Sequence, residues 1–108
     1  MMRGIHMEQQ VEQKREQVAE LCREYHVQRL ELFGSALRDD FDVRHSDLDF
    51  LVEFEQLPAG IYAKTYFGLI EALEKLFQRP VDLVVASAIR NPYFRESVER
   101  NKTLVYAA

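Results

Sequence analysis

The sequence predicts an α/β (α+β) fold, in which a small mixed β-sheet has helices packed on it. Segments with strand-like apolar patterns are interleaved with segments whose apolar residues recur at helical spacing. The 108 residues, 47% hydrophobic and 30% charged, suffice for one modest core. We therefore expect a single domain over residues 8–108, with residues 1–7 as a flexible start of the chain or a remnant of cloning.

The first elements are a helix and two strands. Between Glu8 and His26 apolar residues recur at helical spacing among charges, which predicts an amphipathic helix. The stretch RLELF, which ends at Gly34, is rich in residues suited to strands and predicts a short strand. In DLDFLVEF, residues 47–54, apolar residues occupy every second position, which predicts another strand.

The second half of the chain alternates helices and strands. From Ile61 to Phe77, after the break at QLPAG, apolar residues again form one helical stripe. The sequence QRP ends that helix, and VDLVV predicts a short, largely apolar strand. NPYFRESVERN predicts a helix with Pro92 in its first turn, and TLVYAA predicts a last strand.

Composition narrows the possible functions. A net charge of −4 disfavours a general nucleic-acid surface, which needs clustered Lys and Arg, so we expect no direct nucleic-acid partner. No apolar run approaches the ~20 residues that span a membrane, and no signal sequence opens the chain. The single cysteine, Cys22, excludes an intramolecular disulfide and fits a reducing, cytoplasmic setting.

Three aspartates form the pattern that indicates chemistry. Asp47 and Asp49 lie two residues apart on one predicted strand, so they point to the same face about 6–7 Å apart. Asp82 lies within another predicted strand, where acids are disfavoured. If these strands pair, the three carboxylates repel one another unless a divalent cation binds between them. Oxygen-only ligands favour Mg²⁺ or Mn²⁺ over zinc, and two such ions can support phosphoryl transfer.

The aspartates also have simpler explanations. A D-x-D pair at the start of a strand is usually a solvated polar face, and Asp82 alone is consistent with an exposed edge-strand residue. A calcium loop that started at Asp42 would place Arg44 at a ligand position and Asp47 where the invariant glycine belongs, so that alternative fails. Only the combination of the three aspartates indicates a metal site.

A Gly-Ser pair ends the first predicted strand. Gly34 and Ser35 lead into a helical turn whose backbone N–H groups suit an anion such as phosphate. Ser35 adds a hydroxyl donor, and Arg38, one turn on, can reach the same phosphates. A plain strand-to-helix turn with a Ser N-cap is the simpler alternative. The pattern is neither a Walker loop nor the Rossmann glycine motif.

These motifs follow one another in a specific series: Gly34-Ser35, Arg38, Ser46-Asp47-Leu48-Asp49 and Asp82. The series resembles the nucleotidyltransferase superfamily that includes DNA polymerase beta. From about residue 30 to 108 the chain is most similar to the minimal nucleotidyltransferases, small bacterial and archaeal proteins usually encoded beside a HEPN-domain partner. The stretches SDLDFLVEFE, EKLFQRPVDLV and FRESVERNKTLVYA carry this resemblance.

The resemblance implies a polymerase beta-like nucleotidyltransferase fold and a nucleotide site. Gly34 and Ser35 would hold the phosphates of ATP, and Asp47 and Asp49 would bind two Mg²⁺ ions. Asp82 would bind the catalytic ion and help to deprotonate the acceptor hydroxyl. The family commonly has glycine where this chain has Asp39, next to Arg38.

The resemblance also implies a function and a partner. The protein would be an Mg²⁺-dependent antitoxin that transfers AMP from ATP to a tyrosine hydroxyl of a cognate HEPN toxin, a ribonuclease, and so neutralises it. The alternative is a binding-only antitoxin that blocks the toxin by complex formation, because Asp39 beside the phosphate site would weaken nucleotide binding. In both cases we expect a hetero-oligomer with the toxin.

Overall fold

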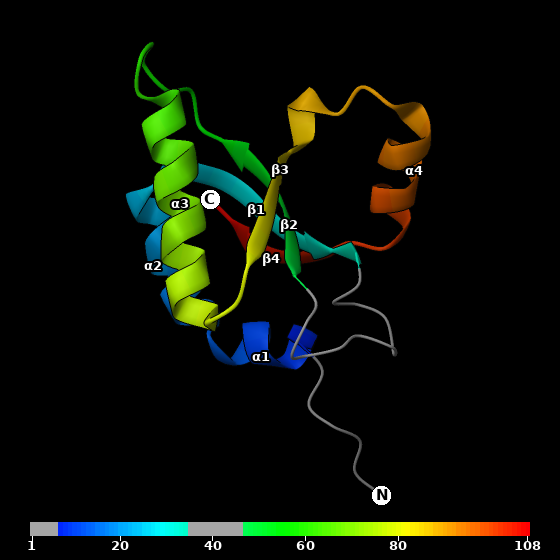
Figure 1. Cartoon of the computed structure of the whole chain (residues 1–108), viewed down its shortest axis with the longest axis horizontal. Helices are drawn as coiled ribbons and strands as arrows, with labels where there is room; N and C mark the ends of the chain where they lie inside the picture. Colours follow the sequence, from blue (N-terminus) through cyan, green and yellow to red (C-terminus); the bar gives the residue numbers. More distant parts are fainter. Residues whose placement is uncertain (1–6, 35–46) are drawn as a thin grey trace, which may run out of the picture.

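The computed structural model describes residues 7–34 and 47–108 and has an α+β fold. A four-stranded sheet with the strand order β3-β2-β1-β4 forms its centre (Figure 1). The elements are, in chain order, α1 (Met7–Gln13), α2 (Arg15–Glu24), β1 (Val27–Phe33), β2 (Leu48–Phe54), α3 (Tyr62–Phe77), β3 (Val81–Val85), the 3₁₀ helix η2 (Ala86–Ala88), α4 (Pro92–Arg100) and β4 (Thr103–Ala107).

The helix predicted over residues 8–26 is broken into α1 and α2. The chain turns at Lys14, which has φ −106° and ψ 20° and lies between the two helices. Arg15 then binds the carboxylate of Glu12 and donates a hydrogen bond of 2.6 Å to the carbonyl oxygen of Val105 in β4. The prediction was correct in the type of structure and wrong in its continuity, because this long-range contact is not visible in local periodicity.

The sheet is mixed, as predicted. β1 pairs in antiparallel fashion with β2 on one side and with β4 on the other. β3 pairs with β2 in parallel, because the chain crosses back over the sheet through α3 between these two strands. β3 and β4 are therefore the two edge strands.

Helices cover the two faces of this sheet unequally. α2 and α3 pack on one face, where the larger core cluster includes Leu30, Phe50, Leu69 and Leu73, all fully buried. On the other face α4 places Val98 against Phe33 and Leu51. The face of β2 that carries Asp49 and Glu53 is therefore partly covered, and Leu51 on this face is only 3% exposed.

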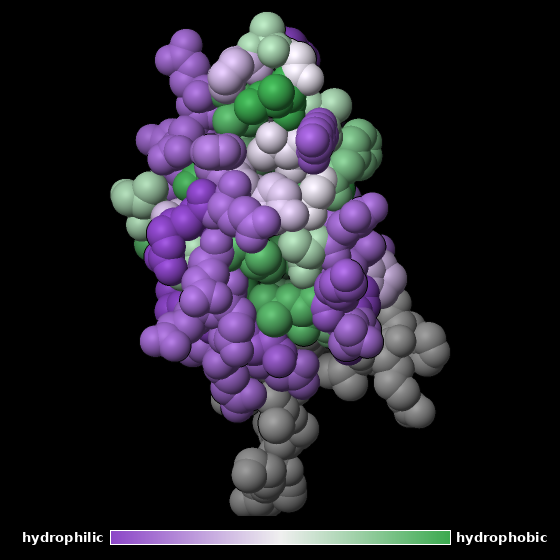
Figure 2. Space-filling view, turned by 90° about the vertical axis from the view of Figure 1, so that its left-hand side faces the viewer, coloured by the Kyte–Doolittle hydropathy of each residue, from purple (hydrophilic) through white to green (hydrophobic). Residues whose placement is uncertain are grey.

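The outer side of the molecule, where α2 and α3 lie, keeps some apolar surface. Figure 2 shows this side, on which hydrophobic and neutral residues form a band between hydrophilic margins. Within α3, Leu69, Leu73 and Phe77 are buried, whereas Tyr62 and Phe67 are 45% and 62% exposed. The predicted apolar stripe of α3 is thus buried in the core toward the C-terminal end of the helix and exposed on the surface at its N-terminal end. No helix in the described part of the chain is long and apolar enough to cross a membrane.

Candidate functional site

Asp49 and Asp82 are brought together by the parallel pairing of β2 and β3. The two residues are register partners, and neighbouring strands lie about 4.8 Å apart. On either side of them Leu48, Phe50 and Leu83 point into the core under α2 and α3. Because side chains alternate along a strand, the two aspartates lie on the opposite face of the sheet. The two strands that carry Asp49 and Asp82 thus pair with each other, which the metal site predicted from the sequence requires.

Asp47 immediately precedes β2 rather than lying within it, and it is exposed. The amide of Leu48 donates a 3.0 Å hydrogen bond to the carbonyl oxygen of Pro80, which fixes the start of β2 against the chain that enters β3. Asp47 is therefore held at the same end of the sheet as Asp49 and Asp82.

The donor chemistry of these residues fits Mg²⁺, because all three offer carboxylate oxygens. Among the side chains that the structure describes, however, no three acidic, histidine or cysteine groups lie close enough together to hold an ion as they stand. An ion bound here would draw on Asp47, Asp49 and Asp82, which the pairing of β2 with β3 holds at one end of the sheet.

Gly34 follows β1 directly and lies against Asp49. Its φ of +78° is a backbone conformation that residues with a Cβ rarely adopt. A Cβ at this position would lie 2.4 Å from Oδ2 of Asp49. Glycine is therefore required here for two reasons, the backbone conformation and the close approach of a predicted metal ligand. The other predicted phosphate-binding residues, Ser35 and Arg38, lie outside the described residues, as does Asp39.

A buried carboxylate that sequence reasoning missed lies on the same face of the sheet. Glu31 in β1 is only 5% exposed, and its carboxylate lies 3.2 Å from Nζ of Lys102 and 3.4 Å from Nε of Arg29. Lys102 also lies 3.0 Å from Glu99 of α4. The charge of Glu31 is therefore compensated by cations, which suits a structural role in tying β1 to the end of α4.

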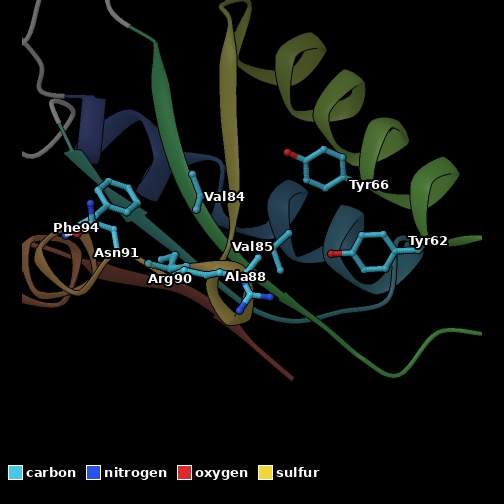
Figure 3. Close-up of a pocket in the computed structure, with 9 residues that line it drawn as sticks. Tyr62, Tyr66, Val84, Val85, Ala88, Arg90, Asn91 and Phe94 are labelled. Carbon is cyan, nitrogen blue, oxygen red and sulfur yellow. Dashed lines mark hydrogen bonds between the residues drawn. The ribbon is translucent and has the colours of Figure 1, made fainter.

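An apolar groove of about 740 Å³ lies at the free edge of β3, where its lining residue Val84 is two residues after Asp82. Figure 3 shows Tyr62 and Tyr66 on α3 at one side of β3, and Phe94 on α4 at the other. The hydroxyl of Tyr66 donates a 2.5 Å hydrogen bond to the carbonyl oxygen of Leu83. Burial, and after it the negative charge of Asp82, raise the pKa of Tyr66. The electrostatic field of Asp82 thus reaches a side chain that lines the groove.

The sequence could not reveal this groove, because its walls form only where residues 62–66 of α3 meet residues 84–94 in the fold. Periodicity assigned Tyr62 and Tyr66 mainly to the core. Tyr66 does pack partly against the core, but Tyr62 is exposed at the mouth of the groove. The signal that was available was aromatic enrichment at the start of α3, directly before the strand that carries Asp82.

Comparison with known proteins identifies the family. Residues 14–105 match the family model described as the nucleotidyltransferase domain. The chain belongs to the nucleotidyltransferase family. The resemblance found in the sequence is thereby confirmed, and so is the predicted fold.

Relatives and solved structures agree with this nucleotidyltransferase assignment. Two Methanocaldococcus jannaschii proteins are 38% and 40% identical to this chain. They are named "Putative protein adenylyltransferase MJ1379" and "Putative protein adenylyltransferase MJ0128", respectively. The first alignment covers 76% of this chain and 78% of the relative, and the second covers 80% and 82%.

Two solved structures show how widely this fold is shared. A structure described as a "putative minimal nucleotidyltransferase" matches with a TM-score of 0.71 and 33% identity, and covers 94% of this chain and 97% of that one. A complex of the tri-AMPylated Shewanella oneidensis HEPN toxin with MNT antitoxin matches with a TM-score of 0.61. At 19% identity, with 91% of this chain and 73% of that one covered, the second similarity establishes the fold alone.

Proposed function

We propose that this nucleotidyltransferase is a protein adenylyltransferase that transfers AMP from ATP to a tyrosine hydroxyl of a HEPN-domain toxin and thereby neutralises it. The observation that carries the proposal is the pairing of Asp49 with Asp82 beside Gly34. The names of the 38–40% identical relatives support a protein acceptor. The AMPylated HEPN toxin in the Shewanella complex supports the identity of the partner.

Each residue of the site has a separate role in this proposal. Gly34, together with Ser35 and Arg38, would hold the triphosphate next to Asp49, against which Gly34 lies. Asp82, which is exposed at the edge strand, would accept the proton of the acceptor hydroxyl. The acceptor oxygen forms a bond to the α-phosphorus while the bond from that phosphorus to the bridging oxygen breaks, and pyrophosphate leaves.

Asp47, Asp49 and Asp82 would hold two Mg²⁺ ions, Asp47 and Asp49 binding both and Asp82 the catalytic one. When bound, Mg²⁺ would offset the negative charge that develops on the attacking and leaving oxygens. The protein's own contribution is to keep three carboxylates at one end of the sheet, where repulsion between neighbouring anions is relieved by cation binding. We place the reaction in the cytoplasm, where ATP is available and Cys22, a free cysteine, stays reduced.

The proposal is tested by incubating the protein with labelled ATP, Mg²⁺ and the HEPN-domain protein encoded beside it. We expect label to appear on the HEPN protein and its ribonuclease activity to fall. The double variant Asp47→Asn/Asp49→Asn should transfer no label. Absence of transfer by the wild-type protein, or full transfer by the double variant, would refute the proposal.

A binding-only antitoxin is the second candidate. The observation that favours it is Asp39, an acidic residue next to Arg38 where the family commonly has glycine. Under this alternative the Asp47→Asn/Asp49→Asn variant still rescues cells from the toxin, whereas under the enzymatic proposal rescue is lost. A toxicity rescue assay with matched expression levels therefore separates the two.

A further inference from the structure

We propose that the groove at the free edge of β3 is the docking site for the acceptor segment of the partner protein, and that it selects a segment with an acidic residue near the acceptor tyrosine. The inference rests on the proposed function. It adds the side from which the acceptor enters and the charge that this segment carries.

The order of the strands places the groove and Gly34 on opposite sides of Asp49. Along the sheet, Gly34 follows β1, Asp49 lies in β2 and Asp82 lies in β3, so the three span two strand spacings, roughly 10 Å. In phosphoryl transfer the attacking and leaving oxygens are roughly in line on opposite sides of the phosphorus. If pyrophosphate leaves on the Gly34 side, the acceptor hydroxyl must approach from the β3 side.

The groove starts on β3 close to Asp82. Val84 lines it and lies two residues after Asp82 on the same face of β3, which corresponds to about 6–7 Å along the strand. The hydroxyl of Tyr66, another lining residue, donates to the carbonyl oxygen of Leu83, the residue next to Asp82. A tyrosine held here would thus have its hydroxyl within reach of Asp82.

The shape and chemistry of the groove suit side chains of a peptide segment. Its walls are aromatic at two sides, with Tyr62 and Phe94 across the edge of β3 from one another (Figure 3). Addition of a full strand to β3 is disfavoured, because the Tyr66 hydroxyl already bonds the carbonyl oxygen of Leu83. The segment would therefore be recognised through its side chains rather than by backbone pairing alone.

One charge gives the groove its selectivity. Arg90 is the only charged residue among those described that line it, and it is exposed. Close by, the guanidinium of Arg95 donates to the carbonyl oxygen of Ile89, a further lining residue. The net charge of the whole chain is −4, whereas Arg90 and Arg95 are positively charged. These two side chains would attract an acidic side chain of the partner and so orient the acceptor segment.

The test uses two variants that alter the groove without removing core side chains. Ala88→Glu places a negative charge in the groove at an exposed residue, and Arg90→Glu reverses its only charge. Ala107→Glu is the matched control, since Ala107 is also an exposed alanine but lies on β4, the opposite edge of the sheet. Thermal melting of all three checks that folding is unchanged.

Two quantities are measured for each protein: the affinity for ATP with Mg²⁺ by calorimetry, and the initial rate of AMP transfer as a function of HEPN-protein concentration. We expect Ala88→Glu and Arg90→Glu each to raise the KM for the HEPN protein by at least about tenfold, which corresponds to roughly 1.4 kcal/mol. ATP affinity should stay within about twofold of wild type, because the groove is not the proposed phosphate site. Ala107→Glu should match wild type in both.

Synthetic peptides test the charge preference directly. A peptide with one tyrosine flanked by glutamates should be modified faster than one flanked by lysines, and Arg90→Glu should reverse that order. Equal rates, or an unchanged KM in both groove variants, would overturn the inference while leaving the proposed function intact. So would a tenfold loss of ATP affinity, which would assign the groove to the nucleobase. If the wild-type protein transfers no AMP, the proposed function fails, and the inference fails with it.

Discussion

Replacement of Gly34 by alanine should damage the site more than the fold. The backbone at this position has φ +78°, and a residue with a Cβ in such a left-handed conformation costs about 1–2 kcal/mol relative to glycine. For a domain of this size each kcal/mol lowers the Tm by roughly 4–8 °C. The variant should therefore fold at moderate temperature and melt measurably earlier than wild type.

The larger effect should fall on catalysis. The new Cβ would lie 2.4 Å from Oδ2 of Asp49, whereas ordinary contact begins at 3.4 Å, so the carboxylate must move by about 1 Å. A displacement of that size at a reacting centre can lower the rate about 10²-fold. At temperatures at which the variant is still folded, we expect kcat/KM for AMP transfer to be about 10²-fold lower than in wild type.

Gly60→Ala is the matched control for this experiment. Gly60 has φ +90°, so alanine meets similar backbone strain there, but nothing lies within 4 Å of the added Cβ. This variant should lose comparable stability and keep its transfer rate. If Gly34→Ala retained as much activity as Gly60→Ala, the close approach of Gly34 to Asp49 would have no part in the reaction.

Three further predictions concern groups around the site. Tyr66→Phe removes the hydrogen bond to the carbonyl oxygen of Leu83 and should lower the free energy of unfolding in urea by about 1 kcal/mol; no change would mean that water replaces the hydroxyl. The hydrogen bond to Glu99 raises the pKa of Lys102. The contribution of this lysine to the free energy of unfolding is therefore complete below about pH 10.4, the pKa of lysine in the unfolded chain, and is lost as the pH rises through the higher pKa of the folded protein. Urea melts between about pH 9 and 12 should show a larger loss in wild type than in Lys102→Met, because the raised pKa values of Tyr66 and Cys22 lower the stability of both proteins over the same range. Burial raises the pKa of Cys22 to about 12, so a thiol reagent should label it only after denaturation, and rapid labelling of the native protein would contradict its buried position.

Local periodicity predicted most of the fold correctly, because each strand and helix here carries its own pattern. The strand at Leu48–Phe54 and the helix at Tyr62–Phe77 begin within one residue of the predicted positions. The break at Lys14 was missed, because Arg15 is fixed by β4, some ninety residues further along the chain. The burial of Leu51 is likewise not visible in the alternation of β2, since it depends on α4, which packs Val98 against this residue.

The site was predictable in part. The three aspartates and Gly34 were selected from residue type and spacing, and the sheet register places Asp49 beside Asp82. Their roles in metal and phosphate binding stay predictions. The contact of Gly34 with Asp49 and the groove at β3 depend on how separate elements meet, which no local pattern encodes.

The register between β2 and β3 also bears on how the length of this protein can vary in evolution. In β3 the buried Val81 and Leu83 flank the exposed Asp82, so one residue inserted before the strand would turn the aspartate into the core. The preceding connection is held at both ends: the amide of Gln78 bonds back to α3, and the amide of Val81 donates to Glu74 at 3.0 Å. Insertions and deletions should therefore be tolerated in the exposed stretch 58–60 and selected against in the three residues before β3.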